Sequence, residues 1–193
     1  MYNQETDNNE LILAAKKGDQ KALTLLINQH AEAIHSFIYS LLGDRHIVED
    51  LSQETFLRMI VAIKDYEFRA PFRSWLFRIA VNLSRDHLRR KKVRNIMSFL
   101  TTEENDDEYT IVDAVQNPFK DLEQKETMNN INLALKSLPE SLRVVFLLRD
   151  VQELSYEEIA DSLKWSLGTV KSRLFRARKE IANYLTQLQE EMI

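Results

Sequence analysis

Apolar residues along this chain recur at intervals of three and four positions, the spacing that places them on one face of an α-helix. The first such block covers residues 9–42 and is divided at Gly18, after which Asp19 is expected to cap a second helix. Gly43 ends this block, and a further helix is expected over residues 46–63. The pattern therefore predicts three helices in the first third of the chain.

The segment Asp65–Arg73, DYEFRAPFR, interrupts the helical spacing and contains a proline, so a loop is expected there. A long helix follows, and its far end, RRKKVR, carries cations that complement the negative end of the helix dipole. The apolar stripe of this helix is formed by Phe72, Leu76, Ile79, Ala80 and Leu83.

From residue 98 to residue 120 the helical pattern is lost and Glu, Asp, Asn and Thr dominate, which predicts a flexible acidic linker. After the linker the pattern returns in four pieces, at residues 121–136, 139–150, 155–163 and 167–189. We therefore predict an all-α protein with two small helical domains, residues 1–97 and 121–193, joined by the linker.

The composition agrees with a helical, intracellular protein. Only 3 Gly and 3 Pro among 193 residues leave little material for the tight turns of an all-β fold. The absence of cysteine excludes disulfides, thiolate zinc sites and a cysteine nucleophile, and suits a reducing cytoplasm. No apolar run approaches the roughly 20 residues that span a bilayer, and the first residues, MYNQETDNNE, lack the order of a secretory signal. We expect a cytoplasmic protein that does not insert into membranes.

The formal net charge of −4 argues against nucleic-acid binding by the chain as a whole, because Lys and Arg drive phosphate binding. The charge is, however, divided by segment. Residues 85–94 carry six basic residues and one acid, and residues 171–179 carry five basic residues and no acid. Residues 101–126 carry nine acids against two lysines. Two local basic segments could therefore bind the phosphates of a nucleic acid.

The region Leu154–Ile181 carries the most informative pattern. Ser155 followed by Glu158 forms a capping box, which predicts the start of a short helix. Residues 164–166 then turn the chain, and Ser166 is expected to cap a second helix. One face of that second helix is apolar and consists of Leu167, Val170, Leu174, Ala177 and Ile181.

The opposite face of this helix is polar and basic. At about 100° per residue, it presents Thr169, Ser172, Phe175, Arg176 and Lys179, with Lys171, Arg173 and Arg178 on its flanks. A helix-turn-helix has this arrangement, with its second helix in the major groove and the flanking cations on phosphates. A solvated amphipathic helix in an ordinary bundle is the alternative; the capped first helix, the tight turn and the absence of acids favour DNA binding.

In the segment EDLSQETFLRM, residues 49–59, the polar stripe of the predicted helix consists of Asp50, Gln53, Glu54 and Leu57. This stripe predicts a contact surface. A carboxylate pair for acid–base catalysis is the alternative, but no Gly-rich loop, substrate-binding pattern or partner histidine supports it.

The histidines do not predict a metal site. His30 and His35 are five positions apart and do not share a helix face, so a helical site together with His46 is not expected. We predict no catalytic residue, no metal and no cofactor.

Aromatic and basic residues are interleaved around the predicted loop. Most of these side chains are expected in the core, but rings beside guanidinium groups also suit an unpaired base, since single strands are held by stacking over a cationic groove. The cluster consists of Tyr66, Phe68, Arg69, Phe72, Arg73, Trp75, Phe77 and Arg78.

Together these motifs resemble those of the extracytoplasmic-function (ECF) group of sigma-70 sigma factors of bacterial RNA polymerase. The resemblance covers about residues 9–188 apart from the linker, with the motifs in the family's order. The segments that carry it are EDLSQETFLR at 49–58, FRSWLFRIAVN at 72–82, Leu138-Pro139 and GTVKSR at 168–173.

The resemblance implies a sigma region 2 domain and a sigma region 4 domain, with the linker in the RNA path of the polymerase. Asp50, Gln53, Glu54 and Leu57 would dock on the clamp helices of the β′ subunit, and the helix from Pro139 would help to meet the β flap. Region 2 would hold the minus-ten element through Tyr66, Phe68, Arg69, Arg73, Trp75, Arg78, Arg85 and Arg89. Region 4 would read the minus-thirty-five element through Thr169, Lys171, Ser172, Arg173, Phe175, Arg176 and Lys179.

The resemblance further implies an anti-sigma factor as a partner, which holds some family members at the membrane, and a monomer when the chain is free. Two residues depart from the family pattern. Lys164 stands where Gly or Asn is frequent, and Trp165 stands where a smaller apolar residue is usual. The acidic linker suits either a nucleic-acid mimic in a cationic channel or a plain solubilising tether.

Three other functions compete with this one. A helix-turn-helix regulator that binds duplex DNA by itself, usually as a dimer, would leave the stripe of residues 50–57 and the aromatic loop without a role. A protein-interaction adaptor would leave the basic faces solvated. A small helical enzyme lacks a constellation of catalytic residues.

Overall fold

The computed structural model describes the backbone of residues 3–101 and 122–191, and the side chains of residues 9–94, 130–188 and 190. Every regular element in these ranges is a helix, which confirms the predicted all-α class. The first half contains α1 (Asn3–Lys16), α2 (Gln20–Leu42), α3 (Arg45–Ala62), the 3-10 turn η1 (Ile63–Asp65) and α4 (Phe72–Thr101). The second half contains α5 (Leu122–Ser137), α6 (Glu140–Phe146), the π-helical turn η2 (Leu147–Val151), α7 (Tyr156–Leu163) and α8 (Leu167–Glu191).

Side-chain caps fix the starts of α2 and α3. The Asp19 carboxylate accepts hydrogen bonds from the backbone N–H groups of Lys21 and Ala22, at 2.8 and 3.1 Å. Asp44 caps α3 in the same way. Gly43, which ends α2, has a φ of 75°, a left-handed conformation that glycine adopts without steric cost. The helix boundaries predicted at Gly18 and Gly43 are confirmed.

Two predicted boundaries differ from the structure. Helix α4 continues to Thr101, past the expected domain end at residue 97, and residues 102–120 of the predicted linker lie outside the described residues. The helix expected over residues 139–150 is α-helical only to Phe146 and then widens into η2. There the Gln152 N–H donates to the Leu147 carbonyl at 2.9 Å. This wide turn buries both Leu147 and Leu148, which are adjacent in sequence.

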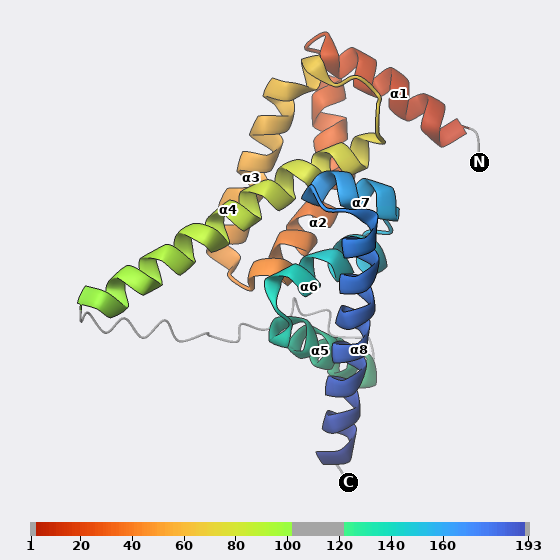
Figure 1. The fold of residues 1–193 in the computed structure, drawn as a ribbon. Helices are drawn as coiled ribbons and strands as arrows, with labels where there is room; N and C mark the ends of the chain where they lie inside the picture. The colour runs from red at the N-terminus through yellow and green to blue at the C-terminus, as the bar shows by residue number, and fades with distance from the viewer. Residues whose placement is uncertain (1–2, 102–121, 192–193) are drawn as a thin grey trace.

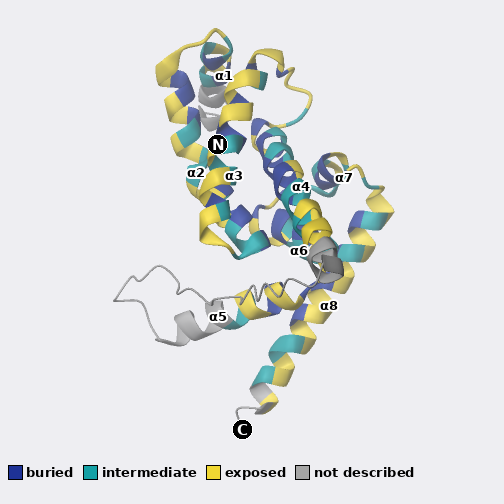
Figure 2. Ribbon diagram, turned by 90° about the vertical axis from the view of Figure 1, so that its left-hand side faces the viewer, coloured by how far each residue is buried: buried dark blue, intermediate teal, exposed yellow. Residues whose placement is uncertain are grey.

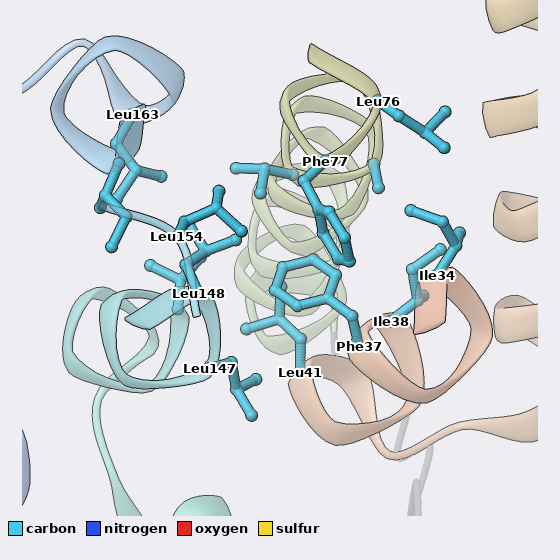
Figure 3. Packing of buried hydrophobic residues seen from close by; sticks show 14 of the residues in the cluster. Ile34, Phe37, Ile38, Leu41, Leu76, Phe77, Leu147, Leu148, Leu154 and Leu163 are labelled. Carbon is cyan, nitrogen blue, oxygen red and sulfur yellow. The ribbon is translucent and has the colours of Figure 1, made fainter. Parts of the chain in front are cut away.

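A single apolar core connects the two halves of the chain. Figure 1 shows the long helix α4 crossing α2 and α3. Helix α7 packs against α4, and α6 packs against α8 and contacts α2. In Figure 3, Phe37 and Leu41 of α2 and Phe77 of α4 lie opposite Leu147 and Leu148. The Phe37 and Phe77 rings meet edge to face with centroids 5.4 Å apart. Burial along α4 alternates with exposure at helical spacing, as Figure 2 shows.

The turn between α7 and α8 passes through a left-handed residue. Lys164 has φ 56° and ψ 42°, and its N–H donates to the Ala160 and Asp161 carbonyls at the end of α7. A left-handed conformation costs a residue with a Cβ roughly 1–2 kcal/mol, and glycine does not bear this cost. The residue that departs from the family pattern therefore carries local backbone strain.

We predict that Lys164→Gly raises the free energy of unfolding by about 0.5–1 kcal/mol, since relief of the strain exceeds the greater entropy of glycine in the unfolded chain. Urea denaturation followed by circular dichroism measures the change. As a control, Glu180→Gly at an exposed position of α8 should lower stability by about 1 kcal/mol. A Lys164→Gly variant less stable than the wild type would contradict the assignment of strain.

Candidate protein and nucleic-acid interfaces

Helix α3 presents the predicted contact stripe on its outer face. Asp50, Gln53 and Leu57 are exposed, and Leu57 keeps 58% of its surface accessible. Glu54 is half-buried and accepts a hydrogen bond from Arg58 Nε at 2.7 Å. The other side of α3 supplies the core with Val48, Thr55, Phe56 and Met59.

The stripe ends in an apolar groove that the sequence pattern missed. Val61, which follows Leu57 by one turn of α3, is 69% exposed. The two side chains line a groove together with Ile79 of α4 and neighbouring residues. Exposed apolar groups beside acidic ones are typical of a surface that a protein partner covers.

The loop after η1 is closed by an internal hydrogen bond. The Tyr66 hydroxyl donates to the Ala70 carbonyl at 2.6 Å, and Tyr66 as a whole is only 5% exposed. This ring lies 4.8 Å from Phe68, 5.2 Å from Trp75 and 5.6 Å from Phe72, measured between centroids. Burial raises the pKa of Tyr66. Tyr66 therefore supports the loop from beneath in this conformation.

Phe68 and Arg69 form the surface of the loop. Phe68 has a φ of 55° and keeps 40% of its surface exposed. A left-handed conformation is uncommon for an aromatic residue, so surrounding contacts must hold it. Arg69 pairs with Glu67 at 2.6 Å, and both side chains are largely exposed. Of the predicted stacking residues, the structure presents Phe68 openly and leaves Trp75 half-buried.

Lys16, the last residue of α1, holds this loop from another helix. Its ammonium group donates to the Tyr66 carbonyl at 2.5 Å and lies 5.8 Å from the centre of the Phe68 ring. Sequence reasoning missed this residue, because a lysine at a helix end suits the helix dipole without any further role. Its partners lie about 50 positions away, and no local pattern indicates them.

The predicted minus-ten arginines of α4 contact the second half of the chain. Arg73 Nη2 donates to the Gln152 side chain at 2.8 Å. Arg78 forms an ion pair with Asp161 of α7. In this conformation both guanidinium groups are engaged within the protein.

Arg85 lies further along α4 and is held in the same way. Its Nε pairs with Glu140 of α6 at 3.1 Å, and its guanidinium lies 5.6 Å from the Trp165 ring. Arg173 of α8 lies 3.9 Å from the same ring. Trp165 therefore packs between cations from the two halves of the chain. Arg89 is exposed and pairs with Asp86 in its own helix at 3.0 Å.

The capping box of α7 is present and includes a residue of α4. The Ser155 N–H donates to Glu158 Oε2 at 2.6 Å, and the Glu158 N–H donates to Ser155 Oγ at 3.2 Å. The Ser74 hydroxyl of α4 donates to Glu158 Oε1. Burial acts to raise the pKa of Glu158, but hydrogen bonds from Ser74 and Ser155 outweigh it and hold the pKa below its usual value.

Helix α8 packs as predicted at all but one position. Ser166 Oγ accepts from the Thr169 N–H at 3.1 Å, so the expected cap of α8 is confirmed. Leu167 is 41% exposed and does not join the packing face, because it lies in the first turn, beyond the contact with the core. The buried face consists of Val170, Leu174, Ala177 and Ile181.

The opposite face of α8 is open to solvent. Phe175 is 70% exposed, and within the described part of the chain neither Arg176 nor Lys179 forms an ion pair. Lys171 and Ser172 are exposed as well, whereas Thr169 and Arg173 are half-buried. The predicted flank residue Arg178 instead makes a bidentate pair with Asp150, at 2.8 and 2.5 Å.

Neither a metal cluster nor a membrane-spanning helix occurs in the described ranges. No group of three or more His, Cys, Asp or Glu residues in these ranges is arranged to hold a metal ion. No helix there is both long enough and apolar enough to cross a membrane. His30 is half-buried against the Phe72 ring, and burial together with the charge of Arg73 lowers its pKa.

Comparisons with known proteins agree with a helical protein that carries a helix-turn-helix. The family described as Sigma-70 region 2 matches residues 26–94, and the one described as Sigma-70, region 4 matches residues 128–181. The RNA polymerase sigma-H factor of Pseudomonas aeruginosa is 31% identical over 194 residues, covering 99% of this chain and 100% of that relative. The ECF RNA polymerase sigma factor SigE of Mycolicibacterium smegmatis is 35% identical over 90% of this chain, which spans 66% of that relative's length.

Among solved structures, the sigma factor RpoE of Bartonella quintana in complex with the anti-sigma factor NepR has the same fold. The TM-score is 0.70 at 23% identity, and the match covers 86% of this chain and 98% of RpoE.

The fold is that of a two-part helical protein whose second part carries a helix-turn-helix. The chain belongs to the sigma-70 family of RNA polymerase sigma factors, in its ECF group. Its region 2 match includes α3 and the aromatic loop, and its region 4 match includes the helix-turn-helix.

The Glu158 contacts predict an acid-sensitive part of the stability. Because the folded pKa of Glu158 is lowered, this stabilisation is fully present above the unfolded pKa, about 4.3, and is lost as the pH falls through the folded value. We expect Glu158→Gln to be less stable than wild type at neutral pH, with the difference shrinking in acid. Urea denaturation at several pH values measures it, and Glu157→Gln, at the exposed neighbouring position, is the control. A difference independent of pH would contradict the pKa assignment.

Proposed function

We propose that this chain directs core RNA polymerase to promoters through three surfaces and has no catalytic role of its own. The observation that carries this proposal is the open polar face of α8 behind a capped helix and tight turn. A helix face with hydroxyls, an exposed ring and unpaired cations can contact the base edges and the phosphates of duplex DNA. We assign region 2 to residues 1–97 and region 4 to residues 121–193, with the linker between them.

Region 4 reads the minus-thirty-five element as duplex. Arg176 reaches a base edge, since a guanidinium can make two hydrogen bonds to guanine. The exposed Phe175 ring suits the methyl group of thymine. Thr169 and Ser172 supply hydroxyls, and Lys171, Arg173 and Lys179 bind phosphates.

Region 2 holds the unpaired strand of the minus-ten element. Phe68 and Trp75 stack on bases beside Arg69, while Tyr66 supports the loop from below. Before Arg73, Arg78 and Arg85 can bind phosphate, their contacts with region 4 must break. Arg89, which is exposed, binds phosphate as well. The described arrangement is therefore assigned to the free, monomeric chain.

The face of α3 docks on the β′ clamp helices of core polymerase. Asp50, Gln53 and Glu54 supply polar contacts, and docking buries Leu57 and Val61, which are exposed in the described structure. The segment from Pro139 to Asp150 helps to meet the β flap. An anti-sigma factor competes for these surfaces, and the protein acts in the cytoplasm.

The test mixes the purified chain with bacterial core RNA polymerase and a random promoter library, and measures co-elution and the sequences from which RNA starts. Co-elution with transcription from one shared two-part motif supports the proposal. Absence of core binding, with DNA selected by the chain alone, would support an independent regulator instead.

We predict that Asp50→Ala combined with Gln53→Ala weakens binding to core polymerase by at least about tenfold, because two polar contacts are lost. The exposed positions leave the fold intact, which circular dichroism verifies. Co-elution titration measures the affinity, and Glu32→Ala, at an exposed acid on α2 outside the stripe, is the matched control. Unchanged affinity of the double variant would remove the proposed docking face.

We predict that Arg176→Ala weakens use of the upstream element by about 1–3 kcal/mol and relaxes the preference at one base position. Lys171→Ala should instead weaken binding to all sequences alike and reduce the salt dependence, as loss of a phosphate contact does. Promoter selection with each holoenzyme distinguishes the two. An unaltered motif for Arg176→Ala would contradict base reading by this residue.

A further inference from the structure

We propose that Lys16 is a positioning residue that fixes the loop of residues 66–70 in the shape that captures a promoter base. This inference rests on the proposed role of that loop in holding the minus-ten element. Lys16 lies in α1, outside the part of the chain that matches the region 2 family.

Two of the hydrogen bonds that define the loop are local. The Tyr66 N–H donates to the Ile63 carbonyl at 3.1 Å, where η1 ends, and the Tyr66 hydroxyl donates to the Ala70 carbonyl at 2.6 Å. These bonds set the curvature of the loop and hold the Tyr66 ring beneath it. They do not tie its exposed part to the rest of region 2.

The bond from Lys16 supplies this tie. Its ammonium group donates to the Tyr66 carbonyl at 2.5 Å, one peptide before the loop turns outward. Hydrogen bonds to a charged donor are stronger than those between neutral groups. The lysine itself is anchored because Ile12 and Ala15, in the same turns of α1, are buried in the core. The loop is therefore held by a rigid helix.

The same ammonium group also lies near the Phe68 ring. The ring lies 5.8 Å from Lys16 Nζ and 4.8 Å from the buried Tyr66 ring. A cation near one aromatic ring and a second ring packed against it favour a single orientation of Phe68. This orientation leaves 40% of Phe68 exposed, so the ring is held ready for an unpaired base rather than folded into the core.

Lys17 offers a matched control. It is the next residue, it is exposed, and it carries the same charge at nearly the same place. A lysine that acted only by attracting DNA would do so at either position. Of these two lysines, only Lys16 has a side chain that contacts the loop in the described structure, so the positioning role belongs to Lys16.

The experiment uses the full chain in holoenzyme with fluorescent single-stranded oligonucleotides that carry the selected minus-ten sequence or one-base variants of it. Lys16→Met should lower the discrimination between the preferred base and its variants by about tenfold or more, as expected for loss of a charge-assisted hydrogen bond. The salt dependence of binding should stay unchanged. Lys17→Met should keep full discrimination, and Lys16→Arg should restore most of it.

A double-mutant cycle makes the test specific. In a Phe68→Ala background, Lys16→Met should have little further effect on discrimination, since the ring that it positions is gone. Thermal unfolding of each variant verifies that α1 and region 2 stay folded. If Lys16→Met does not fold, Lys16→Gln is used in its place.

Two outcomes would overturn the proposal. Unchanged discrimination in Lys16→Met would make the contact merely structural. Lys16 would be a phosphate contact if Lys16→Met weakened the binding of all oligonucleotides equally. The slope of log affinity against log salt concentration would then become smaller by about one. Failure of the wild-type holoenzyme to prefer any base would instead refute the proposed function of region 2.

Discussion

The packing of α4 between two groups of helices is the constraint on which the rest of this structure depends. One face of α4 sends Phe77 into the core that α2 shares with the segment after α6. Ser74 and Arg78, which flank Phe77 along the same side of α4, contact α7. A helix repeats every 3.6 residues, so these three residues, which are three and four positions apart, project to neighbouring sides of α4. The minus-ten surface proposed for α4 is therefore also the contact with region 4.

Magnitudes decide which of these contacts holds the two halves together. A fully buried Leu or Phe side chain contributes about 1.5–3 kcal/mol, whereas an exposed ion pair contributes about 0–1 kcal/mol. Leu147 and Leu148 are fully buried opposite Phe37 and Phe77, while the Arg78–Asp161 pair is partly exposed. The apolar contact supplies the stability, and the polar contacts set the orientation. Opening this interface costs several kcal/mol, which the proposed docking on core polymerase would have to offset.

The sequence predicted features whose causes are local. The capping box of Ser155 and Glu158, the cap at Ser166 and the buried face of α8 depend on residues within one or two turns, so periodicity and capping chemistry suffice to find them. Leu167 shows the limit of this reasoning, because it fits the stripe but lies beyond the element that covers the rest. The bonds from Lys16 to Tyr66 and from Ser74 to Glu158 join residues 50 and 84 positions apart, and no local pattern encodes them.

Trp165 shows how a departure from the family pattern acquires a physical role. A small apolar residue at this turn would contact only its own region, whereas the indole reaches Arg85 of α4 and Arg173 of α8. The arginines proposed for the two promoter elements thus share one ring while the chain is free. When either arginine moves to phosphate, the ring loses one of its two cations, and the remaining contact alone is worth about 0.5–1 kcal/mol. Under the proposed function, binding of both promoter elements therefore requires release of both arginines from the Trp165 ring.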